Sequence, residues 1–192
     1  MNEAKSKFMP LPTWLYVIGW IFFLYLFTSI LHFSPTQPPN IIVAGMYLID
    51  FGVHEVSHMV VFFLPPIFVA SAGSIGEVLF TLLLLFATLK AKSYFAAMFA
   101  GLWVMLGLMS AGIYMADARA QSLPLVGPSE NVQHDWHFVF SQLGILSADT
   151  FIGGAMQIVG IIIGVASLLF GLYLIVRKLL LKNSPVHLPQ AK

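Results

Sequence analysis

The chain has 192 residues, of which 59% are hydrophobic and only 9% are charged, and its mean hydropathy is +0.90. This composition excludes an ordinary soluble domain and is typical of a membrane protein. The formal net charge of +1 provides no basic excess for nucleic acid, and the absence of cysteine excludes disulfides, iron–sulfur clusters and thiolate zinc sites. We therefore expect membrane lipid and membrane proteins as partners, and no nucleic acid.

Five apolar stretches follow one another along the chain, and each is close to the roughly 20 residues that cross about 30 Å of hydrocarbon. They cover residues 13–33, 41–64, 67–89, 94–116 and 151–176. No small-residue cleavage site follows the first stretch, so we expect a retained helix and not a signal peptide. The pattern predicts an all-α, polytopic transmembrane helical bundle of four to five spanning helices. Residues 1–192 form a single transmembrane domain, in which 117–150 is the only long polar connection.

Basic residues in short loops mark the cytoplasmic side of a membrane protein. Apart from Arg119 and Lys192, they form three groups here, namely Lys5 with Lys7, Lys90 with Lys92, and Arg177 with Lys178 and Lys182. All three groups lie on one side only if residues 41–89 make one net crossing. Pro65-Pro66 and the Gly-Ser-Ile-Gly sequence at 73–76 offer breaks for this. We therefore expect a re-entrant or broken element between 41 and 90, with 117–150 facing away from the cytoplasm.

The second apolar stretch contains the sequence His54-Glu55-Val56-Ser57-His58. Two histidines four residues apart project from one face of a helix and can bind the same ion. Burying these polar groups in an apolar segment costs several kcal/mol unless they are paired or bound to metal. The motif therefore predicts a zinc site, in which Asp50 would accept the second N–H of His54. The alternative is a polar cluster that is hydrogen-bonded between helices or that lines a water-filled pore.

Several residues are candidates for a third metal ligand. Glu77 lies 19 positions after His58, which is the spacing of gluzincin metallopeptidases, although it would also suit a helix end that reaches water. Asp117 and His134 flank the polar connection, where Asp135 would join the same pocket. Arg119 is a candidate to bind a substrate oxygen. The alternatives are an ion pair between Asp117 and Arg119, and a solvated loop for His134.

His54-Glu55-Val56-Ser57-His58 in a hydrophobic segment resembles the motif of site-2-protease-like intramembrane metalloproteases. The whole chain is similar to bacterial multi-pass membrane proteins that carry HExxH. This resemblance implies zinc bound by His54 and His58, Glu55 as the general base, and a bacterial inner membrane. The family's later Asn-Pro-x-x-Asp-Gly motif, which supplies its third ligand, is missing. Its place is open to Asp117 or to the pair His134 and Asp135, and Ser57 stands where the family usually has glycine.

The expected function is a zinc-dependent membrane hydrolase, namely an intramembrane metalloprotease that cleaves a transmembrane segment of another protein. Glu55 would activate the attacking water, and Arg119 or His134 would stabilise the oxyanion. A lipid amidase or esterase would use the same chemistry. A different class of function is a non-enzymatic metal- or haem-binding subunit of a larger membrane complex, or a structural accessory subunit with a degenerate site.

Overall fold

The computed structural model describes residues 11–125 and 133–183. Over these residues the chain forms six α-helices and one short 3-10 helix, with no strand, which confirms the expected all-α architecture. In chain order the elements are α2 (Thr13–Leu31), α3 (Ile41–Val60), α4 (Pro66–Lys90), α5 (Tyr94–Ala116), α6 (Asp135–Gln142), the 3-10 helix η1 (Leu146–Ala148) and α7 (Asp149–Asn183).

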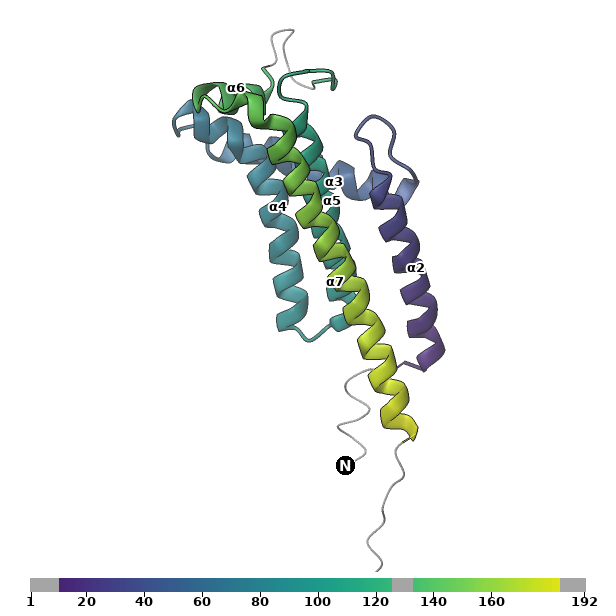
Figure 1. Ribbon diagram of the computed structural model, residues 1–192. Helices are drawn as coiled ribbons and strands as arrows, with labels where there is room; N and C mark the ends of the chain where they lie inside the picture. The colour runs from purple at the N-terminus through teal and green to yellow at the C-terminus, as the bar shows by residue number, and fades with distance from the viewer. Residues whose placement is uncertain (1–10, 126–132, 184–192) are drawn as a thin grey trace, which may run out of the picture.

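Four of these helices, α2, α4, α5 and α7, are long and apolar enough to span a membrane, so the chain is an integral membrane protein. They run lengthwise in the bundle (Figure 1). Helix α5 is the central one, because 78% of its apolar window is buried, compared with 22–33% for the other three. The four spans found among the described residues are the lower end of the expected range of four to five.

Helix α3, which carries the His-Glu-Val-Ser-His motif, is not one of these spans. It runs across the other helices at the end of the bundle where α6 lies (Figure 1). Its first turn is capped by the Asn40 side chain, which accepts hydrogen bonds from the backbone N–H groups of Ile42 and Val43 at 3.0 Å. Pro66 then begins α4 at the position where proline is favoured. The region between 41 and 90 thus contributes one spanning helix, as expected.

The structure does not contain the break that we expected at residues 73–76. Helix α4 continues through this sequence from Pro66 to Lys90. A Cβ atom added to Gly73 would overlap the His54 ring, and one added to Gly76 would overlap the Ser57 side chain. The two glycines therefore allow α4 to approach α3 closely, which is a common use of small residues between membrane helices. The interruption of the chain lies only at residues 61–65, between the two helices.

Helices α5 and α7 also meet through glycines. A Cβ atom on Gly153 would overlap the Gly112 carbonyl oxygen and would lie 2.6 Å from the backbone nitrogen of Ala116. Further along α7, Gly160 lies against the Leu108 side chain and the Met105 backbone. Small residues on α7 thus hold it against the central helix α5, so that the start of α7 is fixed beside the end of α5.

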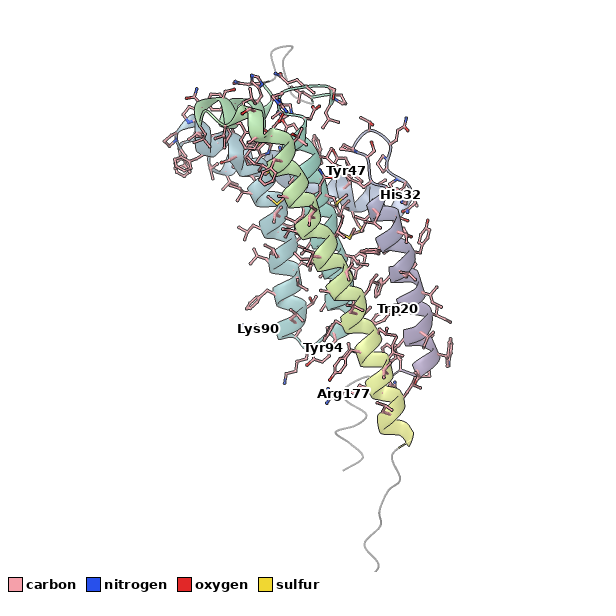
Figure 2. All side chains as sticks on the ribbon, viewed as in Figure 1. Trp20, His32, Tyr47, Lys90, Tyr94 and Arg177 are labelled. Carbon is pink, nitrogen blue, oxygen red and sulfur yellow. The ribbon has the colours of Figure 1, made fainter. Side chains whose placement is uncertain are left out.

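The two ends of the bundle differ in charge. Lys90, Tyr94 and Arg177 lie at one end, whereas His32 and Tyr47 lie toward the other, where α3 crosses the bundle (Figure 2). Lys5 and Lys7 lie outside the described residues. Because basic residues mark the cytoplasmic side, we expect the helix that carries the motif to lie toward the opposite side of the membrane.

Candidate metal centre

Three side chains from two distant parts of the chain meet beside α4. The Oδ2 atom of Asp135 lies 3.3 Å from Nε2 of His54 and 3.4 Å from Nε2 of His58. One ligand atom from each residue lies within 4.8 Å of those of the other two. The two imidazoles share a face because they are one turn apart on α3, and the carboxylate comes from the first residue of α6. Two imidazole nitrogens and a carboxylate oxygen in this arrangement are suited to hold one divalent ion.

Asp135 is held in place by several contacts with the bundle. The Tyr114 hydroxyl donates to Asp135 Oδ2 at 3.3 Å and accepts from the Asp135 backbone N–H at 3.1 Å. The neighbouring Trp136 donates its indole N–H to Ser74 Oγ on α4 at 3.0 Å. The start of α6 is therefore fixed against α4 and α5, and its first carboxylate is directed at α3.

The Nδ1 atom of each histidine has a partner of its own. His58 Nδ1 donates to the Val69 carbonyl oxygen at 2.7 Å, and His54 Nδ1 lies 3.5 Å from Glu77 Oε2. Partners of this kind orient a metal-binding imidazole and leave its Nε2 available to the ion. We expected Asp50 to play this role for His54, but Asp50 instead accepts the Trp103 indole N–H at 2.8 Å. Glu77, from the facing helix, takes its place.

The electrostatic surroundings of the histidines favour a positive charge. Burial lowers the pKa of His54, but the carboxylates of Asp135 and Glu77 outweigh this effect and raise it to about 9. Burial likewise acts to raise the pKa of Asp135, yet its contacts with His54 and His58 keep it below the usual value. A cation placed between these groups is thus stabilised by acidic partners on both sides of the His54 ring.

The other residues proposed from the sequence lie in different places. Glu55 is partly buried and lines the same cavity as the histidines. Glu77 lies behind His54, on the side of the ring away from Asp135. His134 caps α6, since its Nδ1 accepts the His137 backbone N–H, and its Nε2 lies 3.6 Å from Asp117 Oδ2. His134 is therefore a buried structural residue here and not part of a solvated loop.

Asp117 and Arg119 are each occupied elsewhere. Asp117 accepts the backbone N–H groups of Ser122 and Leu123 at 3.0 and 2.9 Å, which shapes the chain after α5. Arg119 donates its Nε–H to Asp149 Oδ1 at 2.8 Å, at the start of α7. The expected alternative, an ion pair between Asp117 and Arg119, is not formed, because Asp149 takes the guanidinium. Arg119 is also not among the described residues that line the cavity.

Asp135 is the candidate ligand that the sequence did not single out. The sequence placed it in the polar pocket and named it only together with His134, as a possible replacement for the missing family motif, whereas Glu77, Asp117 and His134 were the individual candidates. Its one local signal is its position after a residue that can cap a helix, with an apolar run from Trp136 onward. That signal predicts a helix start at this point. The contact with α3 depends on the packing of α6 against α4, which the local sequence does not contain.

A cavity of about 420 Å³ opens beside the three side chains. Its wall includes His54, Glu55, His58 and Asp135, together with apolar and aromatic residues from α3, from α5 and from the connections at this end of the bundle. These are Pro35, Tyr47, Leu48, Phe51, Ala111, Tyr114, Leu123, Pro124 and Leu125. A mostly apolar cavity with a few convergent polar groups is the usual form of a site for an organic ligand.

Comparisons with protein-family models, with curated proteins and with solved structures give no match for this chain. The interpretation of the site therefore depends on its geometry and its chemistry.

Proposed function

We propose that the protein is a zinc-dependent membrane hydrolase whose metal ligands are His54, His58 and Asp135. The observation that carries this proposal is the convergence of both motif imidazoles and a carboxylate at the wall of a cavity that Glu55 also lines. Nitrogen and oxygen ligands of this kind suit zinc, and catalytic zinc sites commonly have three protein ligands and one open position. The fit of the residues supports zinc at this site.

Each residue of the site has a separate role in the proposed mechanism. His54 and His58 offer Nε2 atoms whose orientation is set by Glu77 and by the Val69 carbonyl group, while Tyr114 steadies Asp135. A bound zinc ion would supply Lewis acidity, which polarises the scissile carbonyl group and makes a water molecule more acidic. Glu55 accepts the proton of the attacking water and passes it to the leaving group.

The substrate that we propose is a transmembrane segment of another protein. The resemblance of the motif to that of site-2-protease-like enzymes supports this substrate and supports a bacterial inner membrane as the location. The apolar cavity wall and the position of α3 beside four spanning helices also favour a substrate that is presented by the membrane. Arg119 is not part of this proposal, because Asp149 holds its guanidinium at the start of α7.

The substitution Glu55→Gln tests the mechanism. It removes the proton acceptor and keeps the shape of the side chain, so we expect turnover to fall by about 100-fold or more while bound zinc is unchanged. The measurement is cleavage of a quenched fluorescent transmembrane peptide and, in parallel, of a fluorescent acyl amide, with zinc content determined on the same samples. Cleavage of the amide alone would identify a lipid amidase. Full activity of the variant toward either compound would refute the role of Glu55.

A further inference from the structure

Two buried carboxylates lie beyond the metal ligands, toward the inside of the bundle. Glu77 and Asp50 are 3% and 0% exposed. Glu77 Oε1 and Asp50 Oδ2 have no hydrogen-bond partner within residues 11–125 and 133–183. A buried carboxylate oxygen without a partner is costly, and more so inside a membrane protein. These two oxygen atoms are therefore available as acceptors to a cation or to a hydrogen-bond donor.

The charges around the cavity favour a cation. Glu55, Glu77 and Asp135 line it, and Asp50 lies close enough to Glu77 for the two carboxylates to repel each other. No lysine or arginine is among the lining residues that the structure describes. Burial and the nearby Glu77 raise the pKa of Asp50 to about 8, so a cation beside the pair would be needed to keep both carboxylates ionised. Buried charges that remain unpaired are strongly destabilising, so a second cation would stabilise the site.

Glu77 brings this pair of carboxylates to the wall of the cavity. Glu77 directs Oε2 at His54, which leaves Oε1 as an acceptor, and Glu77 lines the cavity together with the hydroxyl-bearing residues Tyr47 and Ser110. Asp50, which does not itself line the cavity but is close enough to Glu77 for their charges to interact, has Oδ1 bonded to the Trp103 indole and Oδ2 without a partner. Carboxylate and hydroxyl oxygens are the groups that bind hard metal ions and that accept hydrogen bonds from ammonium groups.

We propose that Glu77 and Asp50 form a cation subsite at the wall of the cavity. It binds either a second metal ion or the ammonium group of an organic ligand, and it disfavours ligands with a phosphate or carboxylate head group. The proposal extends the proposed function, since it places a positively charged group of the substrate or a second ion beside the first. It does not depend on hydrolysis.

The first arm of the test counts metal ions. The purified protein is dialysed against zinc alone or calcium alone, and the bound metal is measured by mass spectrometry. A second equivalent that is present in the wild type and lost in Asp50→Asn, but kept in Glu55→Gln, would show an inorganic cation at the subsite. Glu55→Gln is the matched control, because it removes one negative charge from the same cavity but not from this pair of carboxylates. A second equivalent that survives in Asp50→Asn would overturn the placement.

The second arm uses dodecylamine and dodecanol, which share one alkyl chain and differ in charge, and measures their binding in detergent by calorimetry. If the subsite takes an ammonium group, the amine should bind about tenfold or more tightly than the alcohol, because a charge-assisted hydrogen bond adds to its affinity. The preference should disappear in Asp50→Asn and persist in Glu55→Gln. A single metal equivalent combined with equal binding of amine and alcohol to the wild type would overturn the proposal.

These experiments distinguish a failure of the proposed zinc site from a failure of the proposed cation subsite. A wild-type protein that binds no zinc at all would refute the metal centre, while the amine measurement would still test the subsite. A protein that binds one zinc ion and shows no preference for the amine would refute the subsite alone.

Discussion

His54 stands between two carboxylates, one at each nitrogen of its ring. Asp135 faces Nε2 and Glu77 faces Nδ1, at 3.3 and 3.5 Å. His58 has the same carboxylate at Nε2 but a backbone carbonyl group at Nδ1. The two rings are thus oriented by different partners, and each presents the same atom to the shared site. The position of His54 further depends on Gly73, which leaves room for its ring against α4.

The substitution Gly73→Ala tests this dependence. The added methyl group would overlap the His54 ring, so the ring must turn away from Asp135 and Glu77. We expect zinc affinity to fall by about tenfold or more while the protein still folds, since a 1 Å displacement of a ligand is enough to weaken such a site. Equilibrium dialysis against zinc measures the change. Gly52→Ala is the matched control, because nothing lies within 4 Å of its added Cβ. Equal affinity in both variants would contradict this role of Gly73.

The sequence predicted the part of the site that depends on local geometry. The four-residue spacing of His54 and His58 on a helix was enough to place both imidazoles together, and Glu55 followed from the motif. Glu77 was expected near the ion, although it lies behind His54. The choice of Asp135 over Asp117 and His134 was beyond the sequence, because all three lie in one polar connection. Only the packing of α6 decides which of them faces α3.

At the scale of whole helices, α3 and α4 show why hydropathy predicted some elements and not others. The apolar stretches gave helices close to the observed bounds, as with residues 94–116 and α5 (Tyr94–Ala116). Hydropathy does not show how a helix is oriented in the bundle, so it did not distinguish the crosswise helix α3 from the spanning helices. The glycines at 73 and 76 were interpreted as a break, since glycine lowers helix propensity. Their effect is instead to let α4 approach α3 closely, and this effect can be seen only when both helices are in place.

The contact between α5 and α7 can be tested with two adjacent glycines. In Gly153→Ala the new Cβ would overlap the Gly112 carbonyl oxygen, so the helices must separate, and overpacking of this kind costs about 1–3 kcal/mol. We expect a lower midpoint of thermal unfolding in detergent. Gly154→Ala adds the same methyl group where nothing lies within 4 Å, so it should leave the midpoint unchanged or slightly raise it. A similar loss in both variants would refute the close contact.

At the scale of the whole molecule, the basic residues Lys90 and Arg177 and the candidate metal centre lie at opposite ends of the bundle. Lys90 and Arg177 are at the end that basic residues assign to the cytoplasm, and α3 crosses the bundle toward the other end (Figure 2). Four spans place both described ends of the chain on one side. We therefore predict that the cavity opens toward the non-cytoplasmic side of the membrane.

The absence of cysteine makes this orientation directly measurable, because single cysteines can be introduced without a background. Ala91→Cys, between α4 and α5, should react with a membrane-impermeant maleimide only from the cytoplasmic side. Gln37→Cys, between α2 and α3, should react only from the opposite side. Both positions are exposed, and neither removes a basic residue. Reaction of both variants from the same side would refute the four-span topology.

The account as a whole depends on one ion held by His54, His58 and Asp135. X-ray absorption at the zinc edge of the purified, zinc-loaded protein tests this claim most directly. It should show two imidazole nitrogens and at least one oxygen at about 2.0–2.1 Å, with the imidazole signal reduced in His58→Ala and zinc occupancy lowered in Asp135→Ala. A protein that retains no zinc, or a spectrum that neither substitution changes, would contradict the metal centre.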